Sequence, residues 1–238
     1  MKLVTILGIA AMSAVSFGQL WDQGDLVNVA GGGTGAIAGA DLSQLETGET
    51  IFGFGAQTTA NNVMADDFTV GAGGWNITAL RFYTYQTGAT APSITGVSWA
   101  IDSDLTSTVV NSTPFNVSFT NVFRVTSGDT TSNNRRIQQV DVTGLNINLA
   151  AGSYFLKWNF AGSGTSGPWA PPLPTSNGVF GLNAQQSIAN AAFAPGVNGA
   201  GGADGAFQIY GEAVPEPATM GLLALGAAFV ARRRKNSK

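Results

Sequence analysis

The chain has 238 residues, of which 44% are hydrophobic and 11% are charged, and its net charge at pH 7 is −3. Disordered chains combine low hydrophobicity with high charge, so this composition excludes them and indicates one or two folded domains. The sequence contains neither cysteine nor histidine. It therefore excludes a disulfide framework, a His-rich zinc site, and serine or cysteine catalysis that depends on a histidine base.

The charges are unevenly distributed along the chain. From Gln19 to Ala213 there are five basic and thirteen acidic residues, a net charge of −8. A segment this acidic repels nucleic acid and anionic lipid, so we expect neither as its partner. The other basic residues stand near the two ends, which indicates targeting segments: Lys2, Arg232, Arg233, Arg234, Lys235 and Lys238.

The first 18 residues have the layout of a secretory signal peptide. Lys2 precedes a mostly apolar stretch from Leu3 to Val15, and Ser16 and Gly18 place small residues three and one positions before a cut. We therefore predict export through the Sec machinery and cleavage by signal peptidase after Gly18. The alternative is an N-terminal strand or helix of the folded core.

Residues 19–213 contain runs that alternate between apolar and polar residues, the pattern of half-buried strands. In SYFLKWNF, Leu156, Trp158 and Phe160 alternate with Lys157 and Asn159. Turn-rich clusters such as GAGG and TSGDTTSNN separate the runs. Eight or more strands with short turns predict one all-β domain, an antiparallel β-sandwich of jelly-roll-like form. The strand candidates are ADDFTV, WNITALRFYTY, GVSWAID, FNVSFTNVFRV, RRIQQVDV, LNINL, SYFLKWNF and AFQIYGEA.

Other parts of this domain carry more specific expectations. Trp75, Trp99 and Trp158 lie on strand patterns and are predicted to be core residues, whereas alternation in FNVSFTNVFRV puts Arg124 on the polar face. One or two helical turns are predicted at Gln185–Ala192. Two segments rich in Gly and Pro are predicted to be long loops, residues 161–178 and 194–205.

Four aspartates beside apolar strands are candidate calcium ligands. Asp66 and Asp67 precede one strand, and Asp102 and Asp104 stand at the end of another. Calcium binds carboxylate oxygens in flexible geometry, and loops of sandwich folds often present them. Aspartates at strand ends also form turns and cap backbone amides, which is the alternative role. No other cofactor is expected.

Two further kinds of chemistry have candidate residues. A glycosidase needs two carboxyl groups across a cleft, but the spacing of Glu46, Glu49, Asp66 and Asp102 places no two of them opposite each other. We therefore predict no enzymatic activity. Trp169, in the loop SGPWAPP, is a candidate for stacking on a sugar ring. Its alternative role is to pin this loop over the edge of the core.

The residues after the domain, Val214–Lys238, form a separate segment. Ala218–Ala231 carries no charge, and as a helix it would be about 21 Å long, against a hydrocarbon core of about 30 Å. Arg232, Arg233 and Arg234 follow at once and favour the cytoplasmic side. We predict transient membrane insertion, with the body outside and the basic tail, residues 232–238, inside. A permanent anchor and a buried C-terminal helix are the alternatives.

This ending resembles the PEP-CTERM sorting domain. Pro215, Glu216 and Pro217, preceded by Val214, match the Pro-Glu-Pro motif, and the arginine cluster matches the basic tail. The two prolines keep the strip extended and accessible to a protease. The resemblance implies processing by exosortase, a membrane protease-transpeptidase, and an association with extracellular polysaccharide. The segment ADDFTV…GGWNITALRFYTYQTG is similar to sandwich bodies often found ahead of this signal.

These features predict an exported bacterial protein that is sorted and processed by exosortase. It would then reside at the cell surface or in the extracellular matrix, where the β-sandwich body has a structural or binding role. The alternative is a secreted carbohydrate-binding or carbohydrate-active protein.

Overall fold

The computed structural model describes residues 18–177, 181–199 and 201–215. The predicted signal peptide, apart from Gly18, lies outside these residues, as do Glu216, Pro217, the apolar stretch 218–231 and the basic tail. Within the described ranges, no helix has the length and apolar character needed to cross a membrane.

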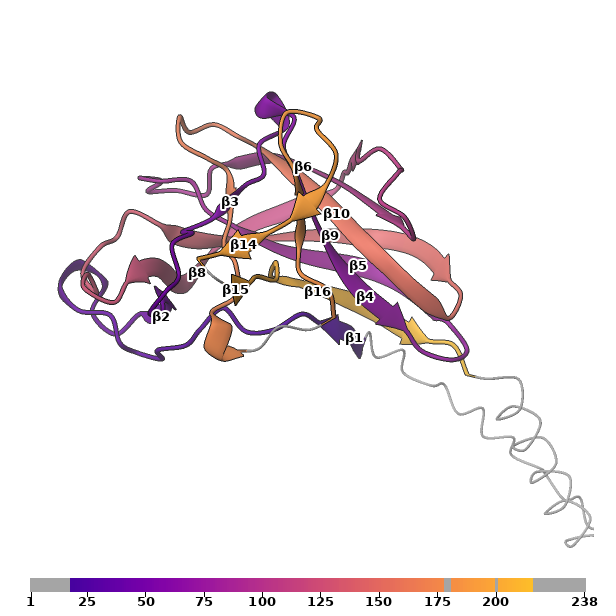
Figure 1. Ribbon diagram of the computed structural model, residues 1–238, viewed down its shortest axis with the longest axis horizontal. Helices are drawn as coiled ribbons and strands as arrows, with labels where there is room; N and C mark the ends of the chain where they lie inside the picture. The colour runs from indigo at the N-terminus through magenta and orange to yellow at the C-terminus, as the bar shows by residue number, and fades with distance from the viewer. Residues whose placement is uncertain (1–17, 178–180, 200, 216–238) are drawn as a thin grey trace, which may run out of the picture.

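Two six-stranded sheets make up most of the described chain, which is all-β as the sequence predicts (Figure 1). The first sheet contains, in spatial order, β1 (Gly18–Asp22), β16 (Phe207–Ala213), β5 (Trp75–Thr84), β9 (Arg136–Leu149), β8 (Phe115–Thr126) and β2 (Asp41–Leu45). The second contains β13 (Ala194–Pro195), β12 (Gln185–Ser187), β4 (Val63–Val70), β10 (Gly152–Gly162), β6 (Ile94–Asp102) and β7 (Val110–Asn111).

Short elements connect these strands. Two-stranded sheets pair β3 (Phe54–Gly55) with β11 (Trp169–Ala170), and β14 (Val197–Asn198) with β15 (Gly201–Gly202). Three short 3₁₀ helices are present in the described residues: η1 (Gly35–Ile37), η2 (Thr58–Ala60) and η3 (Thr175–Asn177).

Successive long strands pass from one sheet to the other, from β4 to β5 and from β5 to β6. Most neighbouring strands are antiparallel, as the sequence predicts, but β2 and β8 are parallel. The first and last described strands, β1 and β16, are neighbours, with Gly18 opposite Gly211. The jelly-roll form stays a prediction.

The main core lies between the two sheets, because apolar side chains of both sheets turn inward. Trp158 of β10 contacts Phe82 of β5 and Phe207 of β16, with ring centroids 5.7 and 5.8 Å apart, and all three are fully buried. Each such side chain contributes roughly 1.5–3 kcal/mol by leaving water. Trp75 is also buried, and Trp99 packs partly buried against this core. The predicted core tryptophans are confirmed.

Two local predictions are wrong, whereas the strand candidate ADDFTV is confirmed as part of β4. Asp66 and Asp67 belong to this candidate, and pairing with β10 continues through both residues. Gln185–Ala192 contains no helix; its first three residues form β12 on β4, where strand pairing satisfies more backbone groups than one isolated helical turn. The two predicted long loops contain the short strands β11, β13, β14 and β15.

Candidate functional site

A polar groove of about 810 Å³ lies on the outer face of the second sheet, away from the core. Its floor is formed by β4, β10 and β6, through Val63, Asn159 and Ser98. The walls are η2, the loop after β6 (residues 104–109) and the loop after β12 (residues 190–193). Ten of the eighteen lining residues carry a hydroxyl or amide side chain, so the surface is suited to hydrogen bonding.

The floor of the polar groove follows from strand alternation. Trp158 points into the core, so Lys157 and Asn159 on either side of it point outward. Lys157 is nevertheless only 1% exposed, because the walls cover it. Its Nζ lies 2.7 Å from Asp102 Oδ2 and also donates to the carbonyl of Ser107. Burial raises the pKa of Asp102, but hydrogen bonds from Lys157 and Ser107 outweigh this and lower it.

Two hydroxyl–amide pairs hold side chains along the same floor. Ser98 Oγ donates to Asn111 Oδ1 at 2.6 Å, and Thr58 Oγ1 donates to Asn159 Oδ1 at 3.2 Å. Each bond uses the oxygen of the amide and orients its NH₂ group as a donor. The ring of Phe193 adds an apolar wall, with its centroid 6.0 Å from Lys157 Nζ. Fixed amide donors beside an aromatic ring suit a ligand with many hydroxyl groups.

Backbone strain is concentrated around the polar groove. The non-glycine residues with positive φ in the described chain are Asn61 (53°), Leu105 (65°), Ala189 (52°) and Asn190 (63°). Asn61, Leu105 and Asn190 line the groove, and the fourth residue, Ala189, directly precedes Asn190. Left-handed backbone costs a non-glycine residue roughly 1–2 kcal/mol, and such residues cluster at ligand sites. A hydrogen bond from Asn190 N to Asn61 O, 3.1 Å long, ties two walls together.

The four predicted calcium ligands do not come together. Asp66 is fully buried on the inner face of β4, whereas Asp67 faces outward. Asp102 forms the ion pair described above, and Asp104 accepts hydrogen bonds within its own turn. The described residues contain no group of three or more His, Cys, Asp or Glu that could hold a metal ion.

Asp66 has a structural environment. Its carboxylate accepts hydrogen bonds from Gly205 N at 2.7 Å and Asp67 N at 2.8 Å. Burial, together with the nearby carboxylate of Asp204, raises the pKa of Asp66 well above its usual range. A raised pKa disfavours the ionised form that a calcium ligand needs.

Trp169 lies half-buried along a second groove of about 400 Å³. Ile188 and Val197, 57% and 56% exposed, line the same groove. The backbone of Trp169 pairs with Tyr85 and Gly55, so the residue also pins its loop. The predicted sugar contact of Trp169 stays a prediction.

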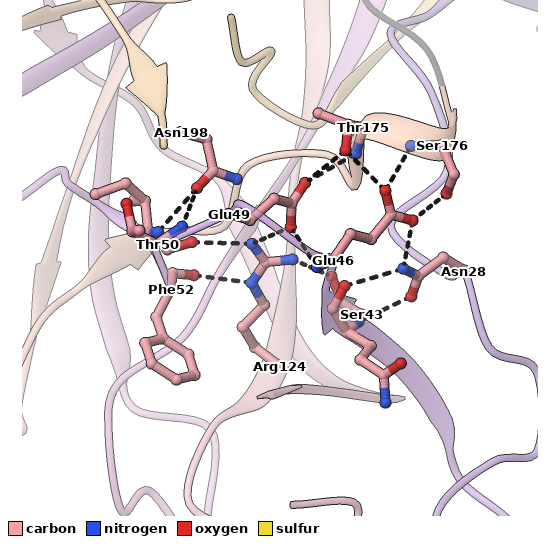
Figure 2. A network of polar contacts seen from close by, with 12 residues as sticks. Asn28, Ser43, Glu46, Glu49, Thr50, Phe52, Arg124, Thr175, Ser176 and Asn198 are labelled. Carbon is pink, nitrogen blue, oxygen red and sulfur yellow. Dashed lines mark hydrogen bonds and ion pairs between the residues drawn. The ribbon is translucent and has the colours of Figure 1, made fainter. Parts of the chain in front are cut away.

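Figure 2 shows a polar network that contains two of the carboxylates considered for a glycosidase. Glu46 accepts a hydrogen bond from the hydroxyl of Thr175 at 2.7 Å, and Glu49 accepts one from the backbone N–H of Thr175 at 2.9 Å. Ser176 and Asn28 also donate to Glu46. Burial raises the pKa of Glu46, but these hydrogen bonds outweigh it and lower the pKa to about 2. A glycosidase acid needs a raised pKa, so Glu46 is unsuited to that role.

Arg124 stands at the centre of this network (Figure 2) and is fully buried, although strand alternation puts it on a polar face. Its guanidinium donates to Ser43 Oγ, Ile51 O and Phe52 O at 3.0, 2.9 and 3.1 Å. An ion pair of 4.0 Å joins it to Glu49. Burial lowers the pKa of Arg124 to about 10, so the side chain stays charged at neutral pH. The network therefore fixes the segment of residues 46–52 over the first sheet.

The described part of the predicted sorting motif directly continues strand β16. Val214 N donates to Gly74 O at 2.9 Å, one step beyond the pairing of Ala213 with Trp75. Val214 and Pro215 are exposed. The other predicted motif residues lie outside the described residues: Glu216, Pro217, Arg232, Arg233 and Arg234.

Sequence reasoning missed the polar groove. Its walls come from three loops far apart in the chain, and its floor residues read as the ordinary polar side of a strand. One local signal was available at Asn61 and Asn190, because asparagine is enriched among residues with positive φ.

Comparison with known families gives one finding. Residues 213–235 match the PEP-CTERM protein-sorting motif, which confirms the resemblance of the C-terminal segment. No curated protein matches the chain.

Proposed function

Because this chain carries a PEP-CTERM sorting motif, which implies an exported protein that is membrane-associated before cleavage by exosortase, we propose a two-part function. Exosortase processes the C-terminal segment, and the β-sandwich body then serves as a binding protein at the cell surface or in extracellular polysaccharide. The polar groove supports the binding role, because hydroxyl and amide side chains line it and residues with a strained backbone stand in its walls.

A neutral carbohydrate is the ligand class that this groove favours. Sugar hydroxyls both donate and accept, which matches side chains such as Asn111 and Asn159. Lys157 is neutralised by Asp102 at 2.7 Å, so no free cation in the floor recruits an anionic polymer. The body also carries a net charge of −8 between residues 19 and 213, which repels anionic polysaccharide.

Binding without catalysis is the role we assign to the groove. A glycoside hydrolase needs one carboxylic acid with a raised pKa facing a second carboxylate. Asp102 has a lowered pKa and is engaged by Lys157. Turnover of a neutral glycan by the purified body would replace this proposal with the enzymatic alternative.

Processing is tested by the mass of the protein in cells that contain exosortase. We expect a mature form that begins at Gln19 and lacks residues 218–238. Glu216→Ala should accumulate the form that retains this tail. A wild-type protein that keeps residues 218–238 in a stable form would instead support a permanent anchor.

Binding is tested by affinity electrophoresis of the body in gels that contain dextran, mannan or the anionic polymer alginate. Asn61→Gly and Asn190→Gly remove one amide each, while glycine accepts the positive φ of these positions without strain. We expect each to weaken retention by a neutral polymer about fivefold, as for loss of one net hydrogen bond. Asn146→Ala, on the exposed side of β9, is the matched control.

Three outcomes contradict the assignment to the polar groove. These are no retention by either neutral polymer, retention by alginate alone, or retention that Trp169→Ala abolishes while both asparagine variants bind normally. The last outcome would move the ligand to the groove beside Trp169.

A further inference from the structure

The last strand of the body delivers the sorting motif without a linker. Ala213 pairs with Trp75 of β5, and Val214 N donates to Gly74 O at 2.9 Å. Only Pro215 separates this last backbone contact from Glu216. An enzyme that acts on the Pro-Glu-Pro strip therefore meets the folded end of β16.

One edge of residues 212–214 is paired, with β5 and Gly74, and the other edge is open. In the described residues, β1 pairs with β16 only as far as Gly18 opposite Gly211. A mature chain that begins at Gln19 has no residue of β1 to pair beyond that point. Hydrogen-bonding direction alternates along a strand, so Ala213 turns its N–H and C=O away from β5 because Val214 bonds toward it. Residues 212–215 are all exposed.

Short turns flank the paired side of this strand end. The turn between β4 and β5, residues 71–74, and the turn between β9 and β10, residues 150–151, contain only glycine and alanine and belong to the β5 side of β16. The end of β16 lies at one end of the two sheets, where its yellow ribbon ends in Figure 1. The open edge faces the opposite side, on which β1 ends its pairing at Gly18.

We propose that exosortase binds residues 212–215 as a preformed strand, by pairing its own backbone with the open edge at Ala213. The proposal rests on the processing by exosortase stated above. Strand addition to an exposed edge is a common mode of peptide recognition, in which backbone hydrogen bonds provide affinity. A strip already held extended by β5 and Gly74 loses less conformational entropy on binding than a flexible one.

A spacer experiment tests whether the fold presents the motif. Eight Gly and Ser residues inserted between Ala213 and Val214 keep the motif and everything after it intact but separate it from β16. The same insert between Ser127 and Gly128, in an exposed turn, is the matched control. In a pulse–chase experiment on the full chain, we expect the first insert to slow tail removal about fivefold, the factor that one net hydrogen bond provides. Equal or faster processing would overturn the proposal.

A point variant tests the open edge itself. Ala213→Pro removes the N–H that faces this edge but no hydrogen bond to β5, whereas Ala213→Ser keeps the N–H. We expect slow processing for the proline variant and normal processing for the serine variant. Equal processing of both, with a thermal melt that matches wild type, would contradict pairing at Ala213. If Ala213→Pro lowers the melting temperature of the protein, the spacer experiment is the test of strand presentation.

Failure of this inference is distinguishable from failure of the proposed function. If Glu216→Ala blocks tail removal but the spacer and Ala213→Pro do not slow it, exosortase processing stands and strand pairing is wrong. If Glu216→Ala has no effect on the tail, the processing assignment itself fails.

Discussion

Replacing the buried Arg124 by methionine should destabilise the body strongly. Arg124→Met keeps a side chain of similar length but removes three donated hydrogen bonds, to Ser43 Oγ, Ile51 O and Phe52 O. It also removes the partner of Glu49, whose side chain is only 2% exposed. Removing one partner of a buried ion pair lowers the free energy of unfolding by about 3–5 kcal/mol.

The structure places the expected cost at the lower end of this range. Glu49 also accepts hydrogen bonds from Thr175 and from Glu46 N, so its charge is not left without partners. We therefore expect the free energy of unfolding to fall by about 3 kcal/mol. Guanidinium titration followed by tryptophan fluorescence measures this change. Arg135→Met is the control, since Arg135 is less buried and stacks on the ring of Phe52, a contact worth about 0.5–1 kcal/mol.

A double-mutant cycle separates the charge from the hydrogen bonds. Glu49→Gln removes the buried negative charge, so Arg124→Met should cost less in that background than in wild type. A cost below about 1 kcal/mol for Arg124→Met alone would refute the reasoning, because it would mean that the network in Figure 2 adds little to stability.

Three further variants test other features of the body. Burial raises the pKa of Glu46, but hydrogen bonds outweigh it and lower the pKa from 4.5 to about 2. The stability that ionised Glu46 provides above pH 4.5 should therefore be lost as pH falls toward 2, and Glu46→Gln should flatten this part of an acid-unfolding curve. Burial and the carboxylate of Asp204 raise the pKa of Asp66 above 3.8, so the wild-type protein should lose stability as pH rises above 3.8. Asp66→Asn should therefore reduce the difference between the melting temperatures at pH 4 and pH 8. Ala189→Gly relieves left-handed backbone at an exposed position and should raise the free energy of unfolding by about 0.5–1 kcal/mol in urea titration, as the strain removed exceeds the entropy that glycine adds.

The strands could be predicted because their information is local. Alternation along β10 put Leu156, Trp158 and Phe160 on one face, and all three are fully buried in the core. A period of two needs no knowledge of the partner strand. The sorting motif was predictable for the same reason, since its prolines, apolar stretch and arginines are adjacent in the sequence.

The burial of polar residues could not be predicted in this way. Arg124 has the sequence pattern of an exposed strand residue, and only the segment that contains Ile51 and Phe52, more than seventy positions earlier, makes its site polar and closed. Lys157 is similar, because the loop that carries Ser107 covers it. In both cases long-range contacts determine which polar side chains are covered.

The polar groove lies on one sheet, and Val214, the first residue of the sorting motif, continues a strand of the other. Val214 continues β16 in the first sheet, whereas Asn159 and Lys157 lie on the outer face of the second. The core separates the two sheets, so a ligand in the groove does not compete with exosortase for the end of β16. We therefore expect the unprocessed Glu216→Ala protein, held on membranes, to bind the same neutral polymer as the mature body with an affinity within about twofold, as for independent sites. A clearly weaker affinity of the unprocessed form would show that cleavage activates the groove, and the two sites would then have to be coupled through the sandwich.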